Sequence, residues 1–310
     1  MGHLPVQEKW QMSTTPKPKT PLKHQFQFLG VALLGVLVLL YPMTAHWFSQ
    51  LNQSDLLGQY SVEVDQIALQ ERESALTSAR EYNENLNSGA AFDPFTHGLA
   101  GTDSEPYQEY LSQLEGVPTG VMGRVVIPEI DVDMPIYHGT SEETLLQGVG
   151  HLYGTALPVG GEGTHSVLTT HSGLADHRMF TDLPDLEEGD IFTVETYGEQ
   201  LHYEVIDMQE VLPHETETLV PETGRDLMTL VTCTPIGVNS HRMLVTGERT
   251  DVIDGPEQEY PMQSTVPGFP WWAAILGAAV LGSVVYLWRS NRGGHQKATD
   301  TAASLISNIE

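Results

Sequence analysis

Two uncharged apolar segments frame the middle of this 310-residue chain. The first runs from Phe26 to Tyr41, and the second runs over eighteen residues from Trp271 to Trp288. At about 1.5 Å of helix per residue, the second reaches ~27 Å, close to the hydrocarbon thickness of a bilayer. Lysines precede the first segment and arginines follow the second. Because positive flanks favour the cytoplasm, we expect two anchors in the cell membrane, with residues of about 49 to 270 on the extracellular side.

The first apolar segment has a second interpretation, as a signal peptide cleaved near Ala45. Its apolar run is longer than most signal-peptide h-regions, and it lacks an Ala-x-Ala site. The uncleaved anchor is the favoured interpretation, and cleavage stays open as the alternative.

The section between the anchors is strongly acidic. Between Trp47 and Pro270 there are 38 acidic residues, seven arginines and no lysine. Such a surface argues against binding nucleic acid through its phosphates, so no nucleic-acid partner is expected. The chain has one cysteine, which excludes an internal disulfide and leaves the thiol free.

Short apolar and β-branched runs dominate from Gly123 onward. They are Arg124–Pro128, Val132–Tyr137, Ser166–Thr170, Asp190–Tyr197, Leu201–Met208, Asp226–Cys233 and His241–Glu248. Seven or eight short strands at this spacing predict a mainly β protein built on a closed or nearly closed barrel. Upstream, apolar residues from Val64 to Leu86 recur at helical spacing and predict an amphipathic helix that packs on this barrel.

The chain's only cysteine, Cys233, is predicted where a strand gives way to a turn-rich loop. Arg242 opens the next strand, so the two residues are expected near each other. A guanidinium beside a thiol favours the nucleophilic thiolate and can also hold a developing oxyanion. His171 follows another predicted strand and could supply a general acid and base at the same rim. These residue types suit nucleophilic catalysis.

A metal site is the competing interpretation of Cys233, with His151, His165, His171 or His241 as further ligands. The chain has neither Cys-x-x-Cys nor His-Glu-x-x-His spacing, and a structural site with one thiolate is unusual. We therefore expect no metal and no other cofactor.

The stretch Thr229-Leu-Val-Thr-Cys-Thr-Pro-Ile-Gly-Val-Asn-Ser-His-Arg242 resembles the Thr-Leu-x-Thr-Cys signature and downstream arginine of sortases, and its continuation resembles class C, the pilus-assembling type. The resemblance extends through Gly150-His-Leu-Tyr-Gly and Leu168-Thr-Thr-His171-Ser-Gly-Leu. It is dense from about Arg124 to Glu248, and the two-anchor layout agrees with it. The resemblance implies a sortase-type closed β-barrel of about eight strands.

In the family pattern, Cys233 is the nucleophile, His171 the general acid and base, and Arg242 the residue that stabilises substrate and intermediate. We also expect Thr232 and Thr234, which flank the cysteine, to contact the substrate. Many class C members carry a basic residue after the histidine. Here that residue is Ser172, which leaves recognition of the acceptor open.

The same pattern identifies Asp93-Pro94-Phe95 as the class C lid. In that pattern the aromatic ring covers the cysteine and the aspartate pairs with the arginine. Proline would hold the backbone so that both side chains point into the cleft. From the residues alone, this stretch would be a plain connector.

The resemblance implies a transpeptidase that cleaves a Leu-Pro-x-Thr-Gly-like sorting signal between Thr and Gly and joins the acyl group to a lysine amine of another pilin subunit. Its partners would be pilins or other surface proteins with such signals, a lysine-bearing acceptor and the membrane. Two alternatives stay open. One is a sortase that anchors surface proteins to a cell-wall precursor, and the other is a membrane-tethered binding module with no enzymatic activity.

The expected organisation has eight parts. They are a cytoplasmic tail (1–25), a transmembrane anchor (26–48), an N-terminal helical region (49–90), the lid loop and connector (91–120), the catalytic barrel (121–250), a stalk (251–270), a transmembrane helix (271–288) and a second cytoplasmic tail (289–310).

Overall fold

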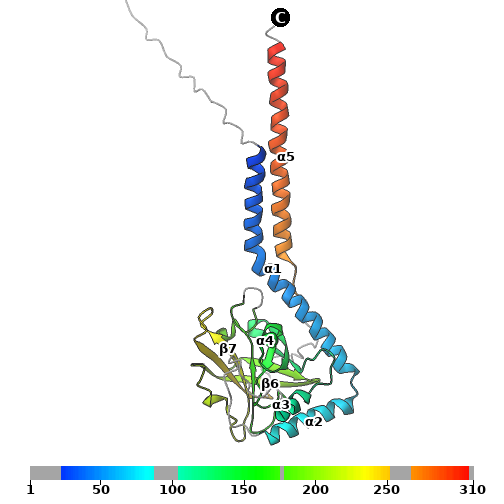
Figure 1. Ribbon diagram of the computed structural model, residues 1–310, viewed down its shortest axis with the longest axis vertical. Coiled ribbons are helices and arrows are strands. Elements are labelled where there is room, and N and C mark those ends of the chain that lie inside the picture. Colours follow the sequence, from blue (N-terminus) through cyan, green and yellow to red (C-terminus); the bar gives the residue numbers. More distant parts are fainter. Residues whose placement is uncertain (1–21, 87–103, 175–177, 252–266, 307–310) are drawn as a thin grey trace, which may run out of the picture. The chain divides into compact units, whose positions relative to one another are not determined.

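A computed structural model of the chain describes residues 22–86, 104–174, 178–251 and 267–306, and these carry a closed barrel of eight strands (Figure 1). The order around the barrel is β1-β2-β3-β4-β7-β8-β6-β5. The strands are β1 (Gly123–Ile127), β2 (Val132–His138), β3 (Val149–His151), β4 (Thr164–Thr169), β5 (Ile191–Thr196), β6 (Glu199–Val211), β7 (Asp226–Thr234) and β8 (His241–Arg249). The predicted mainly β, closed-barrel fold is confirmed.

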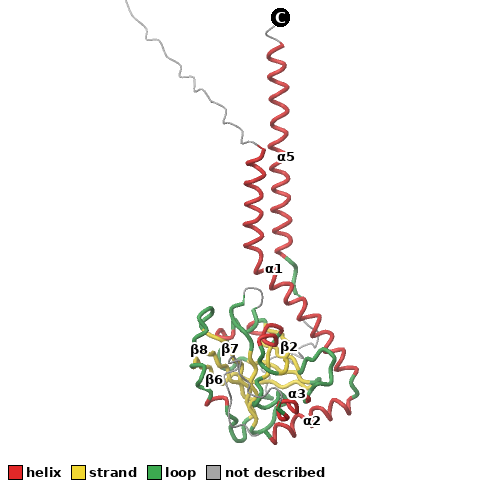
Figure 2. Tube along the Cα trace, viewed as in Figure 1, coloured by secondary structure: helices red, strands yellow, loops and turns green. Residues whose placement is uncertain are grey.

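Helices are found at both ends of the described chain and between the strands (Figure 2). The α-helices are α1 (Leu22–Gln66), α2 (Leu69–Asn85), α3 (Glu105–Ser112), α4 (Glu142–Gln147) and α5 (Trp271–Ile306). Three short 3-10 helices are η1 (Pro128–Ile130), η2 (Leu183–Asp185) and η3 (Glu217–Leu219). Ser141 is followed by two acidic residues, a sequence pattern typical of a helix start. Its hydroxyl accepts a hydrogen bond from the Thr144 amide at 3.2 Å and so caps α4.

The chain forms two compact units. One comprises residues up to Tyr41 together with residues from Trp271, and the other is Pro42–Pro270. Two helical stretches, Lys23–Gln66 and Trp271–Arg289, are long and apolar enough to cross a membrane. These terminal helices indicate that the protein associates with a membrane.

One strand was missing from the sequence expectations. β3 has only three residues, pairs in parallel with β2 and antiparallel with β4, and thereby joins the two halves of the barrel wall. A three-residue strand that contains Gly150 is too short to show an alternating pattern.

The predicted helix from Val64 to Leu86 is divided in two. Val64 belongs to the last turns of α1, and Ala68 has an extended conformation (φ −58°, ψ 140°) before α2 begins. Most of the predicted positions in α2 still face the barrel, because Ala79 is buried in its main core and Ala75 and Tyr82 pack against it, whereas Ala68 is exposed. The periodicity therefore identified the buried face but not the break.

The barrel interior is filled by side chains from alternating strand positions. Leu168 of β4, Leu230 of β7 and Val245 of β8 are fully buried there. Burying a side chain of this size contributes about 1.5–3 kcal/mol. Successive residues of a strand point to opposite faces, so the residues directly before and after each of these three point to the outer face of the wall.

Candidate active site

Cys233 and Arg242 lie directly opposite each other on neighbouring strands. Cys233 is the penultimate residue of β7, and it pairs with Arg242, the second residue of β8. Residues directly opposed in an antiparallel pair point to the same face, with their Cβ atoms about 4.5–5.5 Å apart. Each residue is 9% exposed. The predicted pairing of thiol and guanidinium is therefore built into the strand register.

His171 reaches the same level on the other side of Cys233. β4 and β7 are parallel, with Thr169 opposite Val231, so two residues further along each chain the pair is His171 and Cys233. The imidazole Nε2 lies 3.4 Å from Oε1 of Glu142, the first residue of α4. The register thus brings the three predicted catalytic residues into one row, which runs from the segment after β4 across β7 to β8.

An apolar layer lies beside this row on the outer face. Val231 of β7 and Leu244 of β8 are paired at the preceding level, and Val167 of β4 lies one level further along the wall. Leu152 and Leu219 pack with them in one apolar cluster. All five side chains are at most 3% exposed. This small second core excludes water from one side of the row and lowers the local dielectric, which strengthens charge interactions there.

The β7–β8 loop fixes one side of the arginine. Nη1 of Arg242 donates to the carbonyl oxygens of Asn239, at 3.2 Å, and His241, at 3.1 Å. Asn239 has a left-handed backbone (φ 57°), a conformation that asparagine tolerates well. Both bonds use Nη1, so the loop carbonyls fix the orientation of the guanidinium at one of its nitrogens.

The remaining predicted site residues differ in placement. Thr232 is 1% exposed, and its hydroxyl donates to the Thr170 carbonyl at 2.8 Å. That bond gives Thr232 a role in holding the chain before His171, while its contact with substrate stays a prediction. Thr234 is half-buried at the end of β7. The predicted lid residues Asp93, Pro94 and Phe95 lie outside the described residues.

The histidines considered as metal ligands lie elsewhere or are committed to protein groups. His151 is buried, with Nδ1 3.0 Å from the Tyr110 hydroxyl and Nε2 2.8 Å from the Ala156 carbonyl oxygen, and burial lowers its pKa to about 4. His165 contacts Val220 and Thr229, and burial lowers its pKa. Within the described ranges no group of three His, Cys, Asp or Glu side chains is arranged to hold a metal ion.

Two neighbours of the row were not expected from the sequence. Ser172 donates from its hydroxyl to the Cys233 carbonyl at 2.5 Å. Glu142 lies beside the His171 ring. Ser172 stood out only as a departure from the family pattern. The helix start at Ser141-Glu142 was visible, but the sequence does not show that this turn meets His171.

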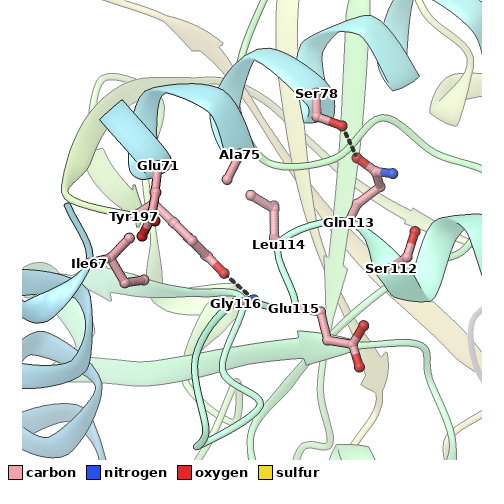
Figure 3. Close-up of a pocket in the computed structure, with 10 residues that line it drawn as sticks. All are labelled: Ile67, Glu71, Ala75, Ser78, Ser112, Gln113, Leu114, Glu115, Gly116 and Tyr197. Atoms are coloured by element: carbon pink, nitrogen blue, oxygen red, sulfur yellow. Dashed lines mark hydrogen bonds between the residues drawn. The ribbon is translucent and has the colours of Figure 1, made fainter. Parts of the chain in front are cut away.

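A cavity of about 250 Å³ lies at a different part of the domain (Figure 3). It is lined by α2, the segment after α3 and the β5–β6 turn, and in it the Tyr197 hydroxyl accepts a hydrogen bond from the Gly116 amide at 2.6 Å. Ile67, Ala75 and Leu114 form its apolar lining. None of the three catalytic candidates lines it, so this cavity is separate from the row.

Comparison with known proteins agrees with this geometry. Residues 125–250 match the Sortase domain. Sortase A of Bacillus anthracis is 30% identical over 128 residues, or 41% of this chain and 59% of that protein. The match to this curated relative therefore spans less than two thirds of its length.

Solved structures match over nearly their whole length. Sortase C-1 from Actinomyces oris is 51% identical, with a TM-score of 0.55, and the match covers 58% of this chain and 99% of that one. Sortase C-1 from Streptococcus pneumoniae is 37% identical, with a TM-score of 0.58, and the match covers 64% of this chain and 98% of that one. With this identity over almost the entire length of a class C enzyme, and with the Cys233, His171 and Arg242 row in place, the chain belongs to the sortase family of cysteine transpeptidases, in its class C.

Proposed function

We propose that this protein is a cysteine transpeptidase that cleaves a Leu-Pro-x-Thr-Gly-like sorting signal between Thr and Gly. The observation that carries the proposal is the opposed pair Cys233 and Arg242, with His171 two residues beyond the end of the adjacent strand β4. A thiol, a guanidinium and an imidazole in one row supply a nucleophile, an oxyanion donor and a proton carrier.

In the first half of the reaction, the Cys233 thiolate attacks the carbonyl carbon of the signal's threonine. Negative charge then develops on the carbonyl oxygen, and Arg242 donates hydrogen bonds to it. His171 protonates the glycine amine as the C–N bond breaks. The products are a thioester between Cys233 and threonine, and a free peptide that begins with glycine.

In the second half, a lysine amine of another pilin subunit attacks the thioester. His171 accepts the proton of that amine, the C–S bond breaks, and an isopeptide bond joins the two subunits. The match to two sortase C-1 structures supports pilins as substrates. Between Trp47 and Pro270 the enzyme has no lysine, so this section offers no side-chain amine with which it could become its own acceptor.

Two further parts of the proposal concern placement and access. The barrel lies on the extracellular side of the cell membrane. Basic residues precede the first apolar helix and follow the second, which favours the cytoplasm for both of these ends. Asp93, Pro94 and Phe95 act as a lid over Cys233, as the sequence resemblance implies.

The test is intact-mass spectrometry of the full chain in detergent after incubation with a peptide that contains Leu-Pro-Glu-Thr-Gly. A Phe95→Ala variant runs in parallel to guard against a closed lid. We expect a mass increase equal to the acyl fragment, absent from Cys233→Ala. Addition of a pilin domain with a single reactive lysine should then discharge the adduct onto that lysine. Transfer to a cell-wall precursor amine instead would identify an anchoring sortase, and no adduct with any variant would leave only the non-enzymatic binding module.

A further inference from the structure

The β4–β7 ladder ends one residue before the catalytic histidine. The last backbone bond runs from the Thr170 amide to the Val231 carbonyl, at 3.3 Å. Without further ties, His171 would extend beyond the ladder on a free loop. Loops of this kind are among the least rigid parts of a fold, because no neighbouring strand satisfies their backbone groups.

Two side-chain hydroxyls continue the connection where the ladder stops. From β7, the Thr232 hydroxyl donates to the carbonyl of Thr170, at 2.8 Å. From the histidine segment, the Ser172 hydroxyl donates back to the carbonyl of Cys233, at 2.5 Å. The residues on both sides of His171 are therefore bonded to the nucleophile's strand, and one of these bonds ends on the cysteine itself.

Packing holds the same segment from outside. The Gly173 amide donates to the Thr181 hydroxyl at 2.9 Å, and the Phe180 amide donates to the His171 carbonyl at 3.2 Å. Ile236 of the β7–β8 loop lies so close to Gly173 that an added Cβ would be 2.3 Å from its Cγ2 atom. Each residue from Thr170 to Gly173 thus has a hydrogen-bond partner, through the backbone of Thr170, His171 and Gly173 and through the side chain of Ser172.

We propose that Ser172 is a positioning residue, whose bond to the Cys233 carbonyl fixes the distance between the catalytic histidine and the nucleophile. This inference rests on the proposed function. The bond joins the backbone next to the imidazole to the backbone of the thiol residue, so a change in one position moves the other. Proton transfer at His171 and attack by Cys233 must occur in one arrangement, and a misplacement of about 1 Å can cost about 10²-fold in rate.

The chemistry of the position requires a short side chain with a donor. Alanine in place of Ser172 would leave the Cys233 carbonyl without this partner, whereas threonine would keep the hydroxyl. Ser240, an exposed serine on the β7–β8 loop, has its hydroxyl 2.9 Å from His241 Nδ1 and is not part of the connection. It provides a matched control for removing a hydroxyl close to the site.

The experiment compares wild type, Ser172→Ala, Ser172→Thr and Ser240→Ala as full chains in detergent. The first measurement is the ¹³C resonance of the Cys233 carbonyl after labelling with [1-¹³C]cysteine, which marks one residue because the chain has one cysteine. We expect this resonance to shift in Ser172→Ala and to remain close to the wild-type position in Ser172→Thr and Ser240→Ala.

The second measurement is the rate of thioester formation over a range of Leu-Pro-Glu-Thr-Gly peptide concentrations. We expect the maximal rate of Ser172→Ala to fall by about 10- to 100-fold with an unchanged half-saturating concentration, since orientation and not peptide binding is lost. Ser172→Thr should recover the rate. An unchanged carbonyl resonance or an unchanged rate in Ser172→Ala overturns the positioning role alone. A wild-type chain that forms no thioester overturns the proposed function and the positioning role together.

Discussion

Cys233 and Arg242 are opposed in the β7–β8 register, and Nη1 of Arg242 is held by two carbonyl oxygens of the connecting loop. The position of the guanidinium relative to the thiol therefore depends on a strand pairing and on two hydrogen bonds to the connecting loop. At this position we therefore expect arginine, a planar donor held in place, to act differently from lysine, a mobile point charge.

We expect Arg242→Ala to lower the rate of thioester formation by about 10²–10³-fold, the loss seen when an oxyanion donor is removed. Arg242→Lys should recover only part of this loss, because an ammonium cannot reproduce the planar fork. Single-turnover kinetics with the sorting peptide measure the effect. Arg80→Ala, which removes a partly exposed pair with Glu199, is the control. Full activity of Arg242→Lys would show that charge alone is sufficient.

Alanine substitutions at two glycines with similar φ angles should distinguish the cost of backbone strain from the cost of steric contact. A Cβ added at Gly173 (φ 72°) would lie 2.3 Å from Cγ2 of Ile236, whereas a Cβ added at Gly163 (φ 75°) would have no atom within 4 Å. Alanine in a left-handed conformation costs about 1–2 kcal/mol, which is the whole cost expected for Gly163→Ala. Gly173→Ala should cost more and also slow acylation. Adding Ile236→Ala should reduce the excess. Urea unfolding measures both variants, and equal destabilisation would mean that Ile236 moves aside freely.

A buried ion pair joins the first two strands of the barrel. Arg124 donates to both carboxylate oxygens of Asp133, at 2.6 and 2.7 Å, and the two side chains are 6% and 15% exposed. Arg124→Met should therefore destabilise the fold by about 3–5 kcal/mol, because the Asp133 carboxylate loses its bidentate guanidinium partner. The double variant with Asp133→Leu should recover most of this loss. Arg80→Met, at an exposed pair, should cost no more than about 1 kcal/mol. Denaturant unfolding tests the set, and similar costs at both pairs would contradict the argument.

Acid should destabilise the barrel through His151. Burial lowers its pKa to about 4 in the folded protein, against about 6.5 in an unfolded chain. Between these values the unfolded chain binds a proton that the folded protein does not, so stability is complete above pH ~6.5 and falls as the pH falls towards 4, by at most about 1.4 kcal/mol per pH unit. His138, whose pKa burial also lowers to about 4, adds a similar dependence.

Unfolding curves between pH 7 and pH 5 test this dependence. His151→Gln keeps a donor for the Ala156 carbonyl but cannot titrate, so the slope of stability against pH should become shallower. His214→Gln, at an exposed position, should leave the slope unchanged. An identical slope in wild type and His151→Gln would show that His151 accepts its proton in the folded state at the usual pH.

The proposed lid makes a prediction about thiol access. Phe95→Ala or Asp93→Ala should increase the rate at which a thiol reagent labels the protein, and the label reports on Cys233 alone because it is the only cysteine. Phe269→Ala, at an exposed phenylalanine, controls for the loss of an aromatic ring. Labelling at the wild-type rate in both lid variants would remove the lid from the proposal.

The barrel and the opposed placement of Cys233 and Arg242 could be predicted because both depend on short-range patterns. Alternation in Asp226–Cys233 identified β7, and a turn-rich loop placed Arg242 at the start of the next strand. In a two-stranded unit of this kind, opposed residues follow from the sequence once the strands are known. The same reasoning failed for β3, where three residues carry no periodicity.

The Ser172 bond could not be predicted for a different reason. It depends on the parallel register of β4 and β7, two strands that are separated by two further strands in the chain and that no short turn connects. The break between α1 and α2 is similar, since Ala68 is a good helix former and its extended conformation is specific to the folded chain. Local propensity does not determine either feature.

The outer face of β4, β7 and β8 carries an apolar level and a catalytic level one above the other, while α4 and the β7–β8 loop border the catalytic level from the side. Cys233 and Arg242 lie in strands, and groups placed in this way keep their geometry when neighbouring loops change length or sequence, whereas His171 follows the end of β4. A designer who wished to redirect the proposed ligation could therefore exchange α4, but would have to keep the β7–β8 loop, because its carbonyl oxygens hold Arg242.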